Sequence, residues 1–184
     1  MNDLITILIV EDEPLTRDAI SHIIREHFEK ENILFISASN GVEALEKLRE
    51  FPSDILLTDI SMPEMDGIEL VKKVDQLYPD VVKIIISGYD DFQYAKNSIR
   101  FHVMDYLLKP VDNQELIQTI AKGIHEVQEA KERNRTTGLM DVHQSGKLSF
   151  LYSTSIIHEM MLAIKTRNET AIHKTVDKIA FYLS

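Results

Sequence analysis

The chain has 184 residues, of which 44% are hydrophobic and 27% charged, so it is a globular chain with roughly one domain and an appendage. The absence of cysteine excludes disulfide frameworks, thiolate zinc sites and thiol nucleophiles, and a net charge of −10 argues against electrostatic binding of nucleic acid by the whole chain. No apolar run approaches a membrane span and the N-terminus lacks a signal peptide's basic flank, so we expect a cytoplasmic protein without membrane association.

Five short apolar runs predict β-strands at residues 4–10, 33–37, 54–58, 82–86 and 103–108. Most are rich in Ile, Leu and Val, as in strands that a parallel sheet buries on both faces. Stretches with apolar residues at steps of three and four separate the strands and predict helices, which open at Pro14, Asn40–Gly41, Asp66–Gly67, Asp90–Asp91 and Asp112. This alternation predicts an α/β fold, a doubly wound five-stranded parallel sheet covered by helices on both sides.

The fifth helix is expected to extend beyond the sheet. Ile117, Ile120, Ile124 and Val127 alternate at steps of three and four, and the polar run at 128–135 can continue the helix. We assign the first two side chains to the chain's own sheet. The last two lie beyond the expected sheet contact, where either this sheet or a partner helix in a coiled coil could cover them.

The composition changes after the fifth helix. Residues 136–147 are polar and include Gly138 and Gly146, which indicates a linker. Apolar faces at 155–165 and 171–180 then predict a helical hairpin. The expected organisation is a domain at 1–125, a helix extension and linker at 126–147, and a hairpin at 148–184 that is either a dimerisation element or the start of a truncated region.

Polar residues gather where the predicted strands end. Ligands of an open α/β sheet bind at the carboxyl ends of its strands, so we expect one pocket there. Its members follow four of the five strands and are Glu11, Asp12, Asp59, Ser87 and Lys109.

The three carboxylates of this set predict a metal site. Carboxylates packed together repel one another unless a cation lies among them, and Mg²⁺ prefers such oxygen ligands. We expect Asp12 and Asp59 to bind the ion directly with the backbone carbonyl of Ser61, and Glu11 to act through water.

The same pocket predicts phosphoryl chemistry. An ionised carboxylate such as Asp59 can attack a phosphoryl group without a catalytic base, provided that the charge on the phosphoryl oxygens is neutralised. Mg²⁺ on one side and the compact ammonium of Lys109 on another would do so, and the hydroxyl of Ser87 could hydrogen-bond a phosphoryl oxygen.

Four motifs together resemble the receiver domain of two-component response regulators. They are Ile-Val-Glu-Asp-Glu at 9–13, Thr-Asp-Ile-Ser-Met-Pro-Glu-Met-Asp-Gly at 58–67, Ile-Ser-Gly at 86–88 and Asp-Tyr-Leu-Leu-Lys-Pro at 105–110, and the match covers residues 4–122. The stretches at 88–95 and 106–111 are similar to regulators with an AraC-type DNA-binding output.

The resemblance implies a flavodoxin-like sheet with strand order 2-1-3-4-5. It also implies individual roles: phosphoacceptor Asp59, acidic metal pair Glu11 and Asp12, phosphate-binding Lys109, switch hydroxyl Ser87 and switch aromatic Tyr106. A cis peptide is implied between Lys109 and Pro110. Glu11 departs from the family, in which aspartate is commonest at this position.

The implied function is that of a response regulator and not of a turnover enzyme. It would take its phosphoryl group from a sensor histidine kinase, dimerise with a second copy and control transcription through an output region absent from this chain. Residues 148–184 are nearly balanced in charge and carry no DNA-binding footprint. The alternative is a receiver-type interaction adaptor without DNA binding. A phosphatase of the haloacid dehalogenase type would need a second carboxylate where Ser61 stands.

Overall fold

The computed structural model describes residues 4–88, 101–145 and 174. The helix expected after Asp91 lies outside the described residues. So does the hairpin expected at 148–184, apart from Lys174, which is helical. The chain divides into two compact units, Met1–Ala130 and Lys131–Ser184.

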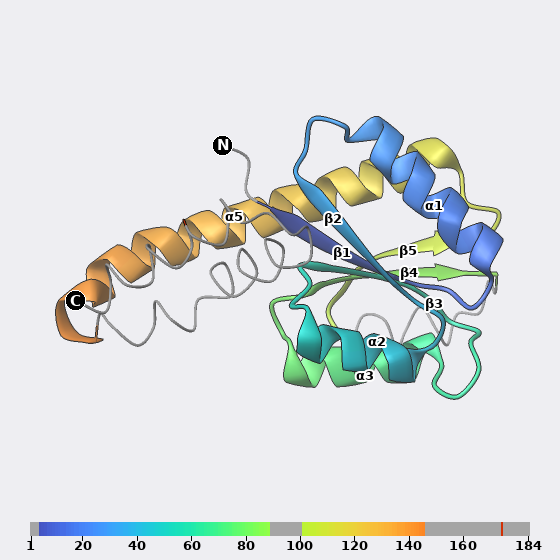
Figure 1. The fold of residues 1–184 in the computed structure, drawn as a ribbon, viewed down its shortest axis with the longest axis horizontal. Coiled ribbons are helices and arrows are strands. Elements are labelled where there is room, and N and C mark those ends of the chain that lie inside the picture. The colour runs from blue at the N-terminus through green and yellow to red at the C-terminus, as the bar shows by residue number, and fades with distance from the viewer. Residues whose placement is uncertain (1–3, 89–100, 146–173, 175–184) are drawn as a thin grey trace. The chain divides into compact units, whose positions relative to one another are not determined.

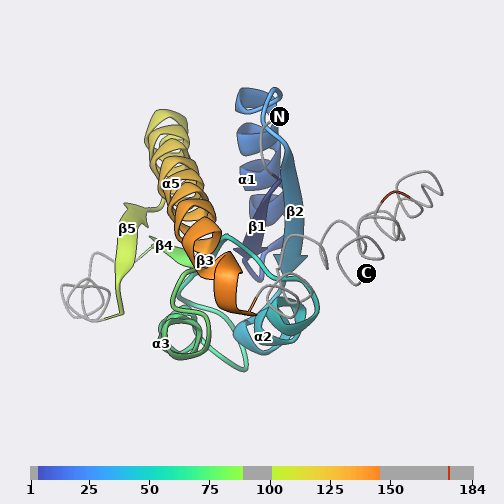
Figure 2. The same cartoon turned by 90° about the vertical axis from the view of Figure 1, so that its left-hand side faces the viewer.

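A five-stranded parallel sheet forms the centre of the first unit. Its order is β2-β1-β3-β4-β5, with β2 at one edge and β5 at the other (Figure 2). The predicted fold and strand order are therefore confirmed, and every predicted strand end agrees within one residue. The strands are β1 (Ile5–Val10), β2 (Ile33–Ala38), β3 (Ile55–Asp59), β4 (Val82–Ser87) and β5 (Val103–Leu108).

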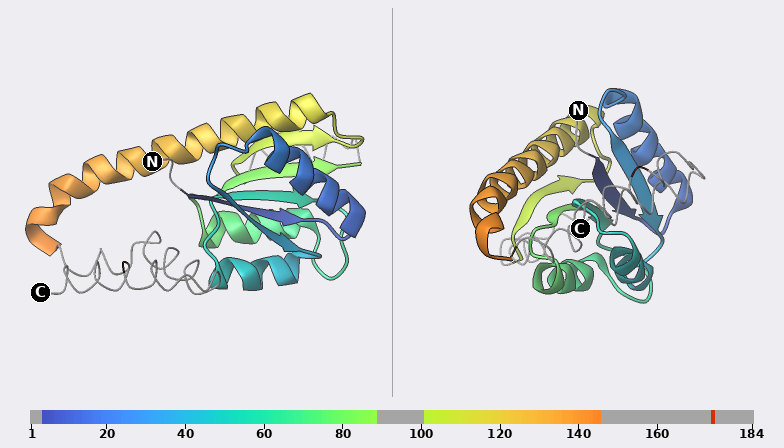
Figure 3. Two further views of the ribbon diagram at one scale, coloured as in Figure 1. Left: turned by 45° about the horizontal axis from the view of Figure 1, so that its top comes forward. Right: turned by 60° about the vertical axis from the view of Figure 1, so that its left-hand side comes forward.

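Helices cover both faces of the sheet. The helices are α1 (Pro14–His27), α2 (Gly41–Glu50), α3 (Gly67–Leu77) and α5 (Asn113–Ser145). Helices α1 and α5 lie on one face, and α2 and α3 on the other (Figures 1 and 3). Side-chain oxygens of Asn40, Asp66 and Asp112 each accept a hydrogen bond from the backbone N–H three residues on, at 2.8 to 3.0 Å. These caps explain why three helices begin where the sequence predicts them.

The sheet separates two apolar clusters because successive side chains of a strand point to opposite faces. Along β1, Ile7 and Ile9 join the cluster beneath α1 and α5, whereas Leu8 and Val10 join the cluster beneath α2 and α3. All residues of β1, β3 and β4 are buried, as the nearly continuous apolar runs predict. The sheet is thus a rigid base that holds its strand ends in place.

The packing of helix α5 decides between the two alternatives left open for Ile124 and Val127. Ile124 and Val127 are only 6% and 5% exposed and belong to the apolar cluster of the chain's own sheet, so no partner helix is needed to cover them. The assignment of Ile117 to the sheet was wrong: it is half-buried and lies outside that cluster, and its neighbour Leu116 is fully buried there. The helix also continues through Ser145, over most of the segment expected to be a linker. Within the described part of the chain, no helix combines the length and apolarity that a membrane crossing requires.

Candidate functional site

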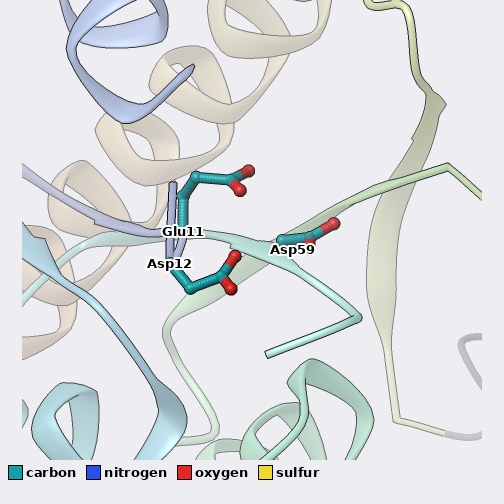
Figure 4. Close-up of side chains that lie close together, drawn as sticks. All are labelled: Glu11, Asp12 and Asp59. Atoms are coloured by element: carbon teal, nitrogen blue, oxygen red, sulfur yellow. The ribbon is translucent and has the colours of Figure 1, made fainter. Parts of the chain in front are cut away.

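Three carboxylates meet at the carboxyl ends of β1 and β3. Glu11 and Asp12 follow β1 directly, and Asp59 is the last residue of β3, the strand that pairs with β1. One oxygen from each carboxylate lies within 4.8 Å of the others (Figure 4). Glu11 and Asp59 are buried, whereas Asp12 is exposed. The site is therefore partly sheltered and open on the side of Asp12.

The ammonium of Lys109 lies between the two buried carboxylates. Its Nζ is 2.8 Å from Oε2 of Glu11 and 3.1 Å from Oδ1 of Asp59. The backbone N–H of Lys109 donates to the carbonyl of Ser87 at 2.7 Å, which ties the end of β5 to the end of β4. The peptide bond between Lys109 and Pro110 is cis, as the sequence predicts.

Burial and charge oppose each other at this pair. Burial raises the pKa of Glu11, and the hydrogen bond and charge of Lys109 offset that rise only in part. Burial alone would lower the pKa of Lys109, but its hydrogen bond with Glu11 and the charge of Asp59 outweigh burial and raise it. Lys109 is therefore protonated at neutral pH. Against its single charge stand three carboxylates, so the described site has a surplus of negative charge.

The loop after β3 contacts the second oxygen of the Asp59 carboxylate. The backbone N–H of Ser61 donates to Oδ2 of Asp59 at 3.2 Å, and the Ser61 side chain is exposed. The loop closes where the N–H of Gly67 donates to the carbonyl of Ile60 at 2.9 Å. A Cβ on Gly67 would lie 1.9 Å from the carbonyl oxygen of Asp59, so a side chain there would force the two segments apart. In the sequence Gly67 marks a helix start and ends one of the receiver-like motifs, but its contact with Asp59 exists only in the folded chain.

Two further residues singled out in the sequence lie nearby. Ser87 is fully buried at the end of β4, one residue beyond the register partner of Asp59. Tyr106 lies in β5, is half-buried, and packs against the apolar cluster beneath α2 and α3. Five of the candidate residues thus lie at the carboxyl ends of the strands, and Tyr106 lies earlier along β5.

Known proteins resemble the chain over this part. A family model described as response regulator receiver domain matches residues 7–121. The uncharacterized transcriptional regulatory protein YesN of Bacillus subtilis is 40% identical over 124 residues, which are 66% of this chain and 33% of that protein. The transcriptional regulatory protein HptR of Staphylococcus aureus is 32% identical over 171 residues, 90% of this chain and 65% of that protein. The chain thus spans between a third and two thirds of the length of these relatives.

Solved structures resemble the fold as well. The two component transcriptional regulator AraC of Clostridium phytofermentans is 35% identical, with a TM-score of 0.61 over 70% of this chain and 98% of that one. The REC domain of AraT, a response regulator of Geobacillus stearothermophilus, is 38% identical, with a TM-score of 0.61 over 68% of this chain and 97% of that one. Both similarities extend over nearly the whole of the solved chain.

Proposed function

The chain belongs to the response regulator receiver domain family, and from this premise we propose that Asp59 accepts a phosphoryl group from a sensor histidine kinase. The observation that carries the proposal is the environment of its carboxylate. Asp59 is buried at a strand end, 3.1 Å from the ammonium of Lys109 and beside two further carboxylates. Its relatives include transcriptional regulators and an AraC-type regulator, in agreement with the subgroup that the motifs suggest.

The transfer needs little from the protein beyond position and charge. An oxygen of the ionised Asp59 forms a bond to phosphorus, while the bond from phosphorus to the donor nitrogen breaks and its electron pair stays on the nitrogen. In the proposal, Lys109 pairs with a phosphoryl oxygen and the Ser87 hydroxyl donates to another. The N–H of Ser61, which faces Oδ2, keeps the carboxylate oriented before the transfer.

A divalent cation fits the charge of this site. The three carboxylates outnumber the one ammonium paired with them in the described site, and carboxylate oxygens are the ligands that Mg²⁺ prefers. We assign Mg²⁺ binding to Asp12, Asp59 and the backbone carbonyl of Ser61, with Glu11 acting through water. When bound, the ion would neutralise charge on the phosphoryl oxygens.

The consequence of phosphorylation belongs to the same proposal. A new dianionic group biases a two-state element, here Ser87 and the half-buried Tyr106, toward a second arrangement. The altered surface would favour a homodimer and, through an output region, a change in transcription in the cytoplasm. The protein is modified in this reaction and is not a turnover enzyme.

Intact-mass analysis after incubation with acetyl phosphate and Mg²⁺ tests the proposal. The wild type should gain one phosphoryl group and Asp59→Asn none, because the amide keeps the size of the side chain and removes the nucleophile. Asp80→Asn, at an exposed position away from the site, should behave as the wild type does. Light scattering on the same samples reports dimerisation. An unmodified wild type, or a modified Asp59→Asn chain, would refute the proposal.

A further inference from the structure

The loop of residues 60–66, here called the acceptor loop, joins Asp59 to α3 and touches the reacting carboxylate directly. Its Ser61 N–H lies 3.2 Å from Oδ2 of Asp59. Its ends are drawn together by the hydrogen bond from the Gly67 N–H to the Ile60 carbonyl. Because the loop is closed in this way, a displacement of Glu64 or Met65 also moves the Ser61 N–H that orients Asp59.

The last part of the acceptor loop contacts the N-cap residue and the first residue of α2. The N–H of Gly41 donates to the carbonyl of Met65 at 3.2 Å, and the side-chain amide of Asn40 donates to Oε1 of Glu64 at 3.4 Å. Glu64 has a φ of 64°, a left-handed conformation that a residue with a side chain adopts only when its surroundings hold it there. The contacts from Asn40 to Glu64 and from Gly41 to Met65 are such a restraint.

Gly41 is required for this contact by space and not by its own conformation. None of the glycines in the described ranges has a positive φ, so other residues could adopt the backbone angles of Gly41. A Cβ at Gly41 would lie 2.7 Å from Cγ, 2.9 Å from Cβ and 2.9 Å from the carbonyl oxygen of Met65. Met65 is only 8% exposed and packs in the apolar cluster beneath α2 and α3, so it has little room to retreat.

We propose that Gly41 is a positioning residue for the phosphoacceptor, because its close approach to Met65 holds the acceptor loop and, through the Ser61 N–H, the carboxylate of Asp59. The inference rests on the proposed function of Asp59. According to this inference, α2 contributes no residue to the site but affects the rate of phosphorylation through the acceptor loop. Any side chain at position 41 separates α2 from the loop and releases Ser61 from its place.

The test is Gly41→Ala in the full chain, with Glu46→Gly as the matched control. Glu46→Gly weakens the same helix at an exposed position within it, away from the loop. At saturating Mg²⁺, Gly41→Ala should slow phosphorylation by acetyl phosphate roughly tenfold, since small misplacements of reacting groups cost this much or more. Glu46→Gly should keep the wild-type rate. An unchanged rate in Gly41→Ala, or an equal loss in both variants, would overturn the proposal.

Two further measurements separate position from stability and from the proposed function. Adding Met65→Ala to Gly41→Ala removes the nearest of the three crowded atoms and should recover part of the rate. Amide NMR spectra without phosphate should show shifted Asp59 and Ser61 signals in Gly41→Ala and unshifted ones in Glu46→Gly. If even the wild type accepts no phosphoryl group, the proposed function fails. The spectra alone then decide whether Gly41 positions the loop, and unshifted Ser61 signals in Gly41→Ala refute it.

Discussion

The side chain of Lys109 shows how one residue offsets part of the negative charge of a partly sheltered site. Its ammonium forms ion pairs with two carboxylates, those of Glu11 and Asp59. Aspartate is commonest in the family at position 11, and the longer side chain of Glu11 reaches the ammonium. Burial works against both charges, yet the pKa of Lys109 is raised because its partners outweigh burial. Lys109 and Glu11 therefore stabilise the fold only together, because the loss of either one leaves the charge of the other uncompensated.

Lys109→Met should destabilise the protein in the absence of Mg²⁺ and increase its response to Mg²⁺. The substitution leaves Glu11 and Asp59 without their ammonium, at a cost on the order of 2 kcal/mol. With that charge gone, the carboxylates attract a divalent cation more strongly, so Mg²⁺ should raise the Tm of the variant more than that of the wild type. Thermal unfolding in chelator and in Mg²⁺ measures both effects. Lys72→Met, on an exposed part of α3, is the control, and equal Mg²⁺ responses in all chains would contradict the expectation.

The residues of the site could be predicted from the sequence because they are chemically unusual at their positions. A charged residue at the end of an apolar run stands out against its neighbours, as Asp59 and Lys109 do. Gly41 and Gly67 could not be recognised in the same way. Glycine beside a helix start has an ordinary local explanation, and its real constraint is a contact with Met65 or with Asp59, which only the fold brings near.

At the scale of elements, β4 and α3 are joined by an ion pair between a buried lysine and a half-buried aspartate, which the strand prediction passed over. Lys83 is 1% exposed, and its Nζ lies 2.7 Å from Oδ1 of Asp75 in α3. Nδ1 of His102 lies 3.1 Å from the same oxygen. The hydrogen bond from Lys83 lowers the pKa of Asp75, although burial opposes it. A lysine within an apolar run resembles an exposed strand position, and only the α3 carboxylate explains its burial.

Asp75→Asn should destabilise the protein by about 3 kcal/mol, because it leaves the buried ammonium of Lys83 without its countercharge. Lys83→Met in the same chain should recover most of that loss, since the long apolar side chain fills the space without a charge to satisfy. Urea unfolding of both single variants and of the double variant measures the coupling. If the losses of the two single variants simply add in the double variant, the pair is not the source of the stability.

The start of α2 should make stability depend on pH in the acidic range. Oε2 of Glu43 accepts hydrogen bonds from the Ser39 backbone and hydroxyl at 2.7 and 2.6 Å. The hydrogen bond from Lys47 is the largest cause that lowers the pKa of Glu43, and the two from Ser39 add to it. Together they lower this pKa from 4.5 to about 2. The folded pKa lies below the unfolded one, so this stabilisation is present above pH 4.5 and is lost as the pH falls through about 2.

Glu43→Gln should therefore cost about 1 kcal/mol at neutral pH, the usual size of a lost helix-capping interaction, and progressively less as the pH falls through about 2. The measurement is the difference in unfolding free energy between wild type and variant over a pH series. Glu46→Gln, an exposed neighbour on α2, corrects for the general effect of removing a carboxylate. A difference that does not change with pH would show that the hydrogen bonds of Glu43, and not its charge, stabilise the helix.

At the scale of the whole molecule, the parallel sheet and its two helical layers follow from a few physical rules, and the strand order follows from the family resemblance. Right-handed crossovers and strands buried on both faces leave a handful of topologies, and the motifs selected one of them. The packing of α5 was not determined in this way. A row of apolar residues at steps of three and four looks the same whether the chain's own sheet or a second helix covers it.

The two possibilities for α5 predict different behaviour of Ile124→Ala. Ile124 is 6% exposed in the cluster that also contains Ile55 and Ile84, so truncation should lower the unfolding free energy by about 2–5 kcal/mol. Because this contact lies within one chain, the loss should be the same at protein concentrations about tenfold apart. Glu126→Ala, on the exposed side of the helix, should have little effect. If the loss depended on concentration and the variant were less associated in sedimentation, a second chain would be covering Ile124.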